Sequence, residues 1–115
     1  MHELVVISNI FKAIKNAASK NNLVKVSKVK LQVGKLRQLE ESMLRFAFDT
    51  ISKETVAQGA QLELDYIPVV MFCTVCSSSF EVKGKKYICP SCESSDLQLL
   101  KGKEVILESI EGERE

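Results

Sequence analysis

The sequence has no apolar run that approaches the ~20 residues needed to cross a bilayer, so we expect no transmembrane helix. Its first fifteen residues contain Glu3, Ser8 and Asn9 and no small-residue cleavage site, so we expect no secretory signal and a cytoplasmic protein. Histidine is scarce, with one in the chain. Without a nucleophile–base pair or a phosphate-binding loop, we do not expect an enzyme.

The composition indicates a folded chain of modest size. The 115 residues suffice for one ordinary domain, or for a small domain that carries a smaller metal-stapled one. The net charge is only +1, but residues 1–37 hold eight Lys or Arg against Glu3 alone, whereas residues 38–72 and the tail from Lys103 are acidic. A basic first third can meet nucleic acid or an acidic protein. The balanced total instead favours a solvated helix face and an exposed strand face.

Two segments have helical periodicity. From residue 4 to residue 20, apolar side chains recur at spacings of three and four, and Asn21-Asn22 ends the pattern. A second helix is predicted from Glu40 to about Val56, because acids at its start suit the positive end of the helix dipole and Gly59 follows its end. The apolar stripes expected to be buried are Leu4, Ile7, Ile10, Phe11, Ile14, Ala17 and Ala18 in the first helix, and Met43, Leu44, Ala47, Phe48 and Ile51 in the second.

Alternation of apolar and polar residues predicts three strands. These cover residues 28–33, 62–66 and 105–110, with Gly34, Pro68 and Gly102 as the breaks between them. The economical architecture is an α+β fold of two helices on a three-stranded mixed sheet, with a zinc-ribbon module inserted between the second and third strands. We therefore expect an α+β domain of residues 1–68 and 103–115 and a zinc-ribbon domain of residues 69–102.

The inserted module contains all four cysteines, as two C-x2-C pairs with twelve residues between them: Cys73, Cys76, Cys89 and Cys92. Each pair forms a knuckle that turns two thiolates toward one point, and two facing knuckles complete a tetrahedron with sulfurs ~2.3 Å from a metal. Residues 80–82 and 87–88, joined at Gly84, are expected to form the short strands of a ribbon.

The alternatives for these cysteines are disulfides, a redox pair and bound iron. A cytosolic chain disfavours disulfides, and a redox motif does not explain two paired knuckles. Iron on four thiolates is chemically reasonable, although spacing and compartment together favour zinc. The site is expected to be structural, because four protein ligands leave no open position for water or substrate.

The N-terminus brings several nitrogen donors together. The terminal amine, the His2 imidazole and the backbone amides of His2 and Glu3 lie within two residues of one another. Deprotonated amides and imidazole are strong-field donors that suit square-planar Ni(II), and Cu(II) would accept the same set. On these residues alone, an incidental surface histidine is the commoner interpretation.

Five motifs occur in a fixed order along the chain: the opening Met1-His2-Glu3-Leu4, then Val33-Gly34-Lys35-Leu36, Leu44-Arg45-Phe46-Ala47-Phe48, the paired knuckles, and Gly102-Lys103-Glu104. In these motifs the sequence resembles the hydrogenase nickel-incorporation factors of the HypA/HybF family. The resemblance covers essentially the whole chain. The opening tripeptide and the ribbon are specific together, and neither is specific alone.

The resemblance implies a metallochaperone that accepts Ni(II), docks on a hydrogenase large subunit and cooperates with a partner GTPase; in some bacteria such factors also serve urease. It implies His2 as a nickel ligand, with the backbone of Met1, His2 and Glu3 contributing, and zinc on the four cysteines. Glu40 is a candidate further nickel ligand, although a helix-start acid that complements the dipole explains it equally well. The sequence departs from the family in Lys35, where an acid is expected, and in the absence of a ribbon histidine.

A different class of function remains as an alternative, namely a zinc-ribbon module that binds nucleic acid or protein. The basic first third would then contact phosphates and give salt-dependent binding. The sequence lacks aromatic residues clustered beside those bases for stacking, which disfavours nucleic acid as a partner.

Overall fold

The computed structural model describes residues 3–115, which fold into two helices, one 3-10 turn and six strands. In chain order these are α1 (Glu3–Lys20), β1 (Leu23–Gly34), η1 (Lys35–Arg37), α2 (Glu41–Ser52), β2 (Gln61–Ile67), β3 (Val70–Cys73), β4 (Ser79–Glu81), β5 (Leu97–Lys101) and β6 (Val105–Arg114). They form two compact units. The first comprises the described residues up to Gln32, Leu39–Asp65 and Val105–Glu115, and the second comprises Val33–Gln38 and Tyr66–Glu104.

The helices of the first unit follow the predicted periodicity. Helix α1 ends where Asn22 adopts a left-handed backbone with φ 57°, and the Asn21 side chain donates to the Ala17 carbonyl at 2.8 Å. Helix α2 ends at Ser52 rather than near Val56, because the backbone of the next residue leaves the helical region. The helices bury Val6, Ile7, Ile10, Phe11, Ile14, Ala18, Leu44, Ala47 and Phe48.

Two predictions of burial on these helices are wrong. Leu4 is 59% exposed and Met43 is 48% exposed, whereas Val6, which the periodicity did not select, is buried. Both exposed residues lie at the margin of their helix's apolar stripe. The pattern therefore places them inward, whereas among residues 3–115 no element covers them.

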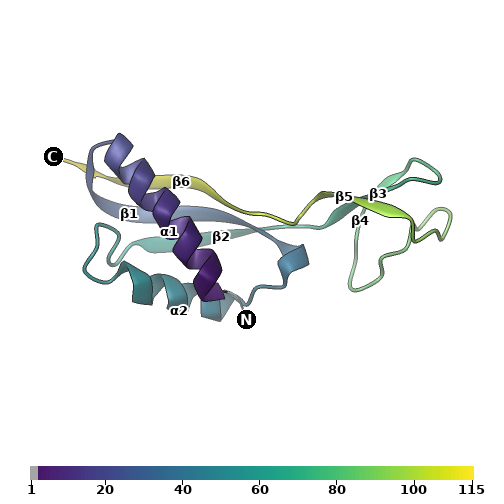
Figure 1. The fold of residues 1–115 in the computed structure, drawn as a ribbon, viewed down its shortest axis with the longest axis horizontal. Coiled ribbons are helices and arrows are strands. Elements are labelled where there is room, and N and C mark those ends of the chain that lie inside the picture. Colours follow the sequence, from purple (N-terminus) through teal and green to yellow (C-terminus); the bar gives the residue numbers. More distant parts are fainter. Residues whose placement is uncertain (1–2) are drawn as a thin grey trace. The chain divides into compact units, whose positions relative to one another are not determined.

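The sheet of the first unit has the strand order β2-β1-β6. Strands β1 and β6 are antiparallel. Ser27 contacts Glu111 and Lys30 contacts Glu108, so residue numbers rise along β1 where they fall along β6. Strands β1 and β2 are joined through α2 and run in the same direction in Figure 1. The predicted α+β fold on a three-stranded mixed sheet is confirmed. The alternating side chains Val29, Leu31 and Val33 are fully buried, as predicted.

The polar face of this sheet carries matched charges. The Lys28 ammonium lies 3.0 Å from the Glu63 carboxylate, and Lys30 lies 3.2 Å from Glu108. The hydrogen bond and charge of Glu63, followed by the charge of Glu111, raise the pKa of Lys28. Two lysines of the basic first third are thus paired with acids from β2 and β6. This supports the interpretation of an exposed, solvated strand face.

The second unit contains an antiparallel sheet of order β4-β3-β5, with Met71 opposite Phe80 on one side and Leu99 on the other. The expected strand at residues 87–88 is not formed, and these residues lie in a loop. Strand β3 takes its place as the partner of the strand at Phe80, and β5 pairs with the other edge of β3. Gly102 follows β5 with φ +100°, where a Cβ would lie 2.6 Å from the Pro68 carbonyl oxygen, so this crossing requires glycine.

Among residues 3–115, no helix is long and apolar enough to span a membrane.

Candidate metal centre

The first knuckle begins at the end of β3. The Cys73 amide donates a hydrogen bond to the Ser78 carbonyl at 2.8 Å, and the Ser77 amide donates one to the Cys73 carbonyl at 2.9 Å. Ser77 closes this turn with a left-handed φ of 61°. These two hydrogen bonds close residues 73–78 into a tight loop, which places Cys76 beside Cys73.

The second knuckle repeats the same hydrogen-bond pattern. The Cys89 amide donates to the Ser94 carbonyl at 2.9 Å, and the Glu93 amide donates to the Cys89 carbonyl at 2.8 Å. Glu93 has a φ of 63°, nearly that of Ser77. The two C-x2-C segments therefore have equivalent backbones, and each presents one buried and one exposed cysteine.

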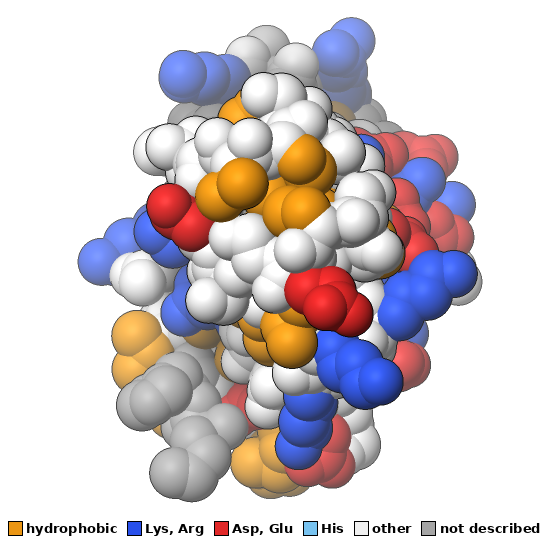
Figure 2. All heavy atoms as spheres, turned by 90° about the vertical axis from the view of Figure 1, so that its right-hand side faces the viewer, with side chains coloured by type: hydrophobic (Ala, Val, Ile, Leu, Met, Phe, Trp, Pro, Cys, Tyr) orange, Lys and Arg blue, Asp and Glu red, His pale blue; other side chains and the backbone are white. Residues whose placement is uncertain are grey.

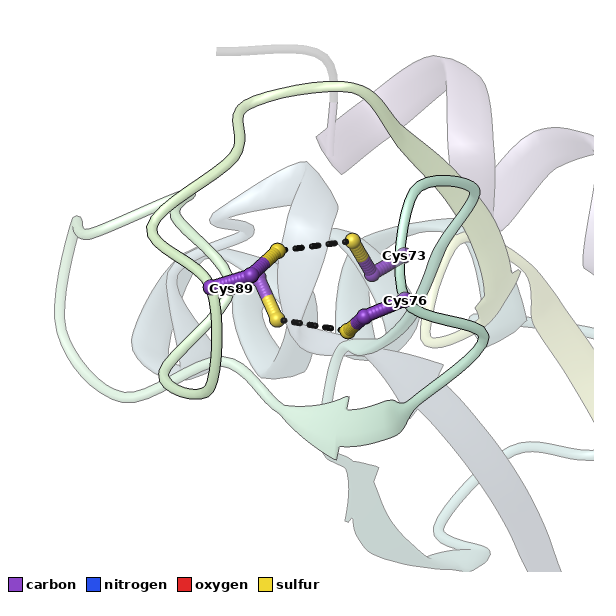
Figure 3. Close-up of side chains that lie close together, drawn as sticks. Cys73, Cys76 and Cys89 are labelled. Atoms are coloured by element: carbon purple, nitrogen blue, oxygen red, sulfur yellow. Dashed lines mark hydrogen bonds between the residues drawn. The ribbon is translucent and has the colours of Figure 1, made fainter.

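The four sulfurs converge on one point. Cys73 Sγ lies 3.6 Å from Cys92 Sγ, Cys76 Sγ lies 3.5 Å from Cys89 Sγ, and all four atoms lie within 4.8 Å of one another. Figure 3 shows the labelled Cys73, Cys76 and Cys89 turned toward one another. A tetrahedron with metal–sulfur bonds of ~2.3 Å has sulfur–sulfur edges of roughly 3.8 Å, so the arrangement fits zinc. Iron favours the same four-sulfur set.

The thiols have opposing electrostatic environments. Hydrogen bonding with the Ser78 side chain, and then with its backbone, lowers the pKa of Cys76 to about 6. For Cys92, the backbone hydrogen bond of Ser94 lowers the pKa, but desolvation and the neighbouring thiols outweigh it and raise the pKa to about 12. Four thiolates at this spacing therefore repel one another unless a cation neutralises them. The cluster is built to hold a metal ion.

The outer surface of the knuckles is largely uncharged. Residues 74–79 contribute serine, threonine and the exposed Val75, and residues 90–95 are mostly proline and serine. Figure 2, which faces the right-hand side of Figure 1, shows a mainly uncharged centre with most charged side chains toward the rim. The exposed lysines of this unit nearest the knuckles lie in the loop between them, at Lys83, Lys85 and Lys86.

Of the residues predicted to bind nickel, Glu3 and Glu40 are brought together, whereas Met1 and His2 lie outside the described residues. The Glu3 side chain is 3% exposed, and its carboxylate accepts the Glu40 backbone N–H at 3.0 Å. The Glu40 carboxylate is exposed and accepts the Ser42 hydroxyl at 2.6 Å. Glu40 stands at the N-cap of α2 without a side-chain bond to the helix amides, and the Ser42 contact uses one of its two carboxylate oxygens.

The same two acids line a cavity of about 450 Å³ between the first turn of α1 and one side of α2. The other lining residues are Leu4, Met43, Phe46, Ala47 and Thr50. Sequence analysis missed this cavity. The signal available for it was Phe46, an apolar residue outside the buried stripe and three positions after Met43.

Comparison with known proteins finds one family and relatives that match nearly the whole chain. A family model described as "Hydrogenase/urease nickel incorporation, metallochaperone, hypA" matches residues 1–112. The hydrogenase maturation factor HypA of Desulfitobacterium hafniense (strain DSM 10664 / DCB-2) is 35% identical, over 98% of this chain and 99% of that one. HybF of Klebsiella pneumoniae is 37% identical, over 98% and 100%. The solution structure of the Ni metallochaperone HypA from Helicobacter pylori superimposes with a TM-score of 0.75 at 29% identity, covering 100% of both chains.

Proposed function

Because the chain belongs to the HypA/HybF family of hydrogenase maturation factors, we propose that it is a nickel metallochaperone that binds Ni(II) at its N-terminus. It helps to insert this cargo into the large subunit of a [NiFe] hydrogenase. The ligands are the His2 imidazole and backbone nitrogens of Met1, His2 and Glu3. The observation that carries this assignment is the bond from the Glu40 amide to the buried Glu3 carboxylate, which supports a fixed start of α1 beside those ligands.

The four cysteines hold a resident structural Zn²⁺ in this proposal. The sulfur separations and the equivalent knuckles support it. Four protein ligands leave no coordination position for a cargo ion, so the two metals use separate sites. Each metal is thus assigned to one of the two domains expected from the sequence: nickel to residues 1–68 and 103–115, and zinc to residues 69–102.

The proposed partners are the hydrogenase large subunit and a hydrogenase-maturation GTPase, together with urease accessory proteins in cells that make urease. The protein acts in the cytoplasm as a carrier and not as a catalyst. Nucleic acid is not a proposed partner, because Lys28 and Lys30 are paired with acids and the knuckle surface is largely uncharged.

Glu40 is retained as a possible further nickel ligand. Its carboxylate is exposed, and its backbone N–H is bonded to the Glu3 carboxylate, which keeps Glu40 near the first residue of α1. Glu40→Gln then weakens nickel binding. Glu41→Gln, one residue further on, serves as the matched control, because Glu41 pairs with Arg45 at 3.0 Å.

The deciding experiment is a Ni(II) titration of the zinc-loaded protein with its native N-terminus. His2→Ala abolishes stoichiometric nickel binding and leaves zinc in place, because the two sites share no ligand. Nickel binding also weakens on acidification through the His reference pKa of ~6.5, since the imidazole must be neutral and amide protons must be lost. Equal nickel affinity in wild type and His2→Ala would remove the nickel function and leave a zinc-ribbon binding module as the better account.

A further inference from the structure

The cavity beside Glu3 and Glu40 is lined by apolar side chains that the fold leaves uncovered. Leu4, Met43 and Phe46 are 59%, 48% and 67% exposed. Large apolar side chains that gather around a cavity on a small protein mark a binding surface more often than scattered single ones do. Two of the three are also the positions where the predicted burial failed. Disagreement between pattern and structure is typical of sites kept for function.

Helix α2 presents a second apolar stripe along this cavity. Met43, Phe46, Ala47 and Thr50 follow the i, i+3, i+4, i+7 spacing, which places them on one side of the helix. The stripe spans eight residues, from Met43 to Thr50, or roughly 10 Å along the axis at 1.5 Å per step. This length matches about two turns of a second helix laid alongside, as in other grooves that accept an amphipathic helix.

The charge at one end of the cavity selects among occupants. Of the two acids that line it, Glu3 is buried and already bonded, whereas the Glu40 carboxylate is exposed. Glu41, the next acid along the chain, is already paired with Arg45 at 3.0 Å. An occupant with a basic residue at this end of its apolar face therefore complements the exposed Glu40 carboxylate.

We propose that the groove formed by Leu4, Met43, Phe46, Ala47 and Thr50 docks an amphipathic helix of a partner protein, with Lys or Arg at the end of its apolar face nearest Glu40. This inference rests on the proposed nickel function, since it states where a partner engages the unit that carries the cargo. The apolar side chains supply most of the contact area. The basic residue supplies orientation through the exposed Glu40 carboxylate.

The test uses two synthetic helical peptides, because the chain has no tryptophan and a single Trp in each peptide gives a clean fluorescence signal. Both peptides carry the same leucine stripe, and one has two lysines at its C-terminal end where the other has two glutamates. The lysine peptide binds the full zinc-loaded chain at least tenfold more tightly at low salt, and the difference shrinks as salt screens the charges. Equal binding of the two peptides, or no binding of the lysine peptide, overturns the proposal.

Variants locate the binding. Phe46→Ser weakens the lysine peptide at least tenfold, whereas Val24→Ser, at a 55% exposed apolar residue of β1, leaves it unchanged. Glu40→Gln removes the preference for lysine. Equal effects of Phe46→Ser and Val24→Ser overturn the proposed location, as does a dimer in sedimentation that Phe46→Ser dissolves. Nickel titration keeps the two proposals distinguishable: Phe46→Ser binds Ni(II) as wild type does, and His2→Ala binds the peptide as wild type does.

Discussion

The two units of this chain are stabilised by different means. The first buries apolar side chains from both helices and from its sheet, among them Ile7, Leu31 and Phe48. In the second unit, the buried hydrophobic residues among those described are Val33, Val69, Cys73 and Cys89. Half of these are candidate metal ligands, so few purely apolar side chains are buried in the second unit, and we expect it to depend on a bound ion to hold its two knuckles together.

This difference also separates two uses of metal. An ion with four ligands from the chain is retained, because each of its coordination positions is filled by a tethered sulfur. A cargo ion must instead be given up, and the proposed terminal nitrogen donors belong to a short segment that can hand the ion on. In the proposed scheme, one chain carries a permanent ion and a transferable ion at two sites that share no ligand.

Removal of zinc should cause the largest loss of stability, and it should unfold the second unit but not the first. Structural zinc contributes about 10–16 kcal/mol in small zinc modules near neutral pH. We expect chelation, or Cys89→Ser, to unfold the sheet of β3, β4 and β5 while the helices persist. Amide hydrogen exchange and far-ultraviolet circular dichroism measure this. Ser91→Ala, inside the second knuckle, should keep both zinc and structure. If the β3 amides stayed protected from hydrogen exchange without metal, the second unit would not depend on zinc and the contrast between the two units would be refuted.

Deletion of residues 105–115 should unfold the first unit and spare the second. Strand β6 pairs with β1 through contacts such as Ser27 with Glu111. Its loss exposes a sheet edge and uncovers part of the core, so we expect a cost of about 5 kcal/mol or more, beyond most single substitutions. Thermal unfolding monitored by helical signal measures it, with removal of Glu115 alone as the control. An unchanged melting temperature would show that β6 is dispensable.

Phe48→Ala should destabilise the first unit by about 3–5 kcal/mol and leave zinc affinity unchanged. Phe48 is 1% exposed, and its ring centroid lies 6.5 Å from that of Phe11. Phe46→Ala is the matched control, because the same residue type on the same helix is 67% exposed and should cost no more than about 0.5 kcal/mol. Similar costs for the two variants in denaturant unfolding would contradict the observed burial.

Glu108→Gln should cause the smallest change in stability, and this change should be confined to the first unit. Hydrogen bonds from Gln32 and then Lys30 lower the pKa of Glu108 below its ordinary value. A lowered folded-state pKa contributes stability above the unfolded value, and this contribution is lost as pH falls through the folded pKa. The variant should therefore lose less stability than wild type between pH 5 and acid, as measured by unfolding at several pH values. Glu113→Gln should leave the wild-type pH profile intact.

Local spacing made much of this structure predictable from the sequence. The two C-x2-C pairs fix their own turns, because each knuckle is closed by hydrogen bonds within six residues. The alternation at Val29, Leu31 and Val33 identified the central strand of the first sheet. These features depend on residues near one another in the chain, and such patterns are what a single sequence records.

Features that depend on distant partners were missed. Strands β3 and β5 pair Phe72 with Gln98, which lie far apart in sequence and meet only once the knuckles have formed. The alternation at Leu97 and Leu99 was the one local signal for β5. The bond from the Glu40 amide to Glu3 has no signal at all in the sequence, because every non-proline residue carries the same backbone donor.

The insertion of the second unit between β2 and β6 has a consequence for folding. Strand β6 must return to β1 after a long excursion of the chain, and closing a flexible loop costs more entropy as the loop lengthens, about 0.6 kcal/mol per doubling. An ion that gathers Cys73 through Cys92 shortens the effective excursion before β6 pairs. We therefore expect zinc to favour closure of a sheet that supplies none of its ligands, with β6 joining β1 faster in the metal-loaded chain than in the metal-free chain.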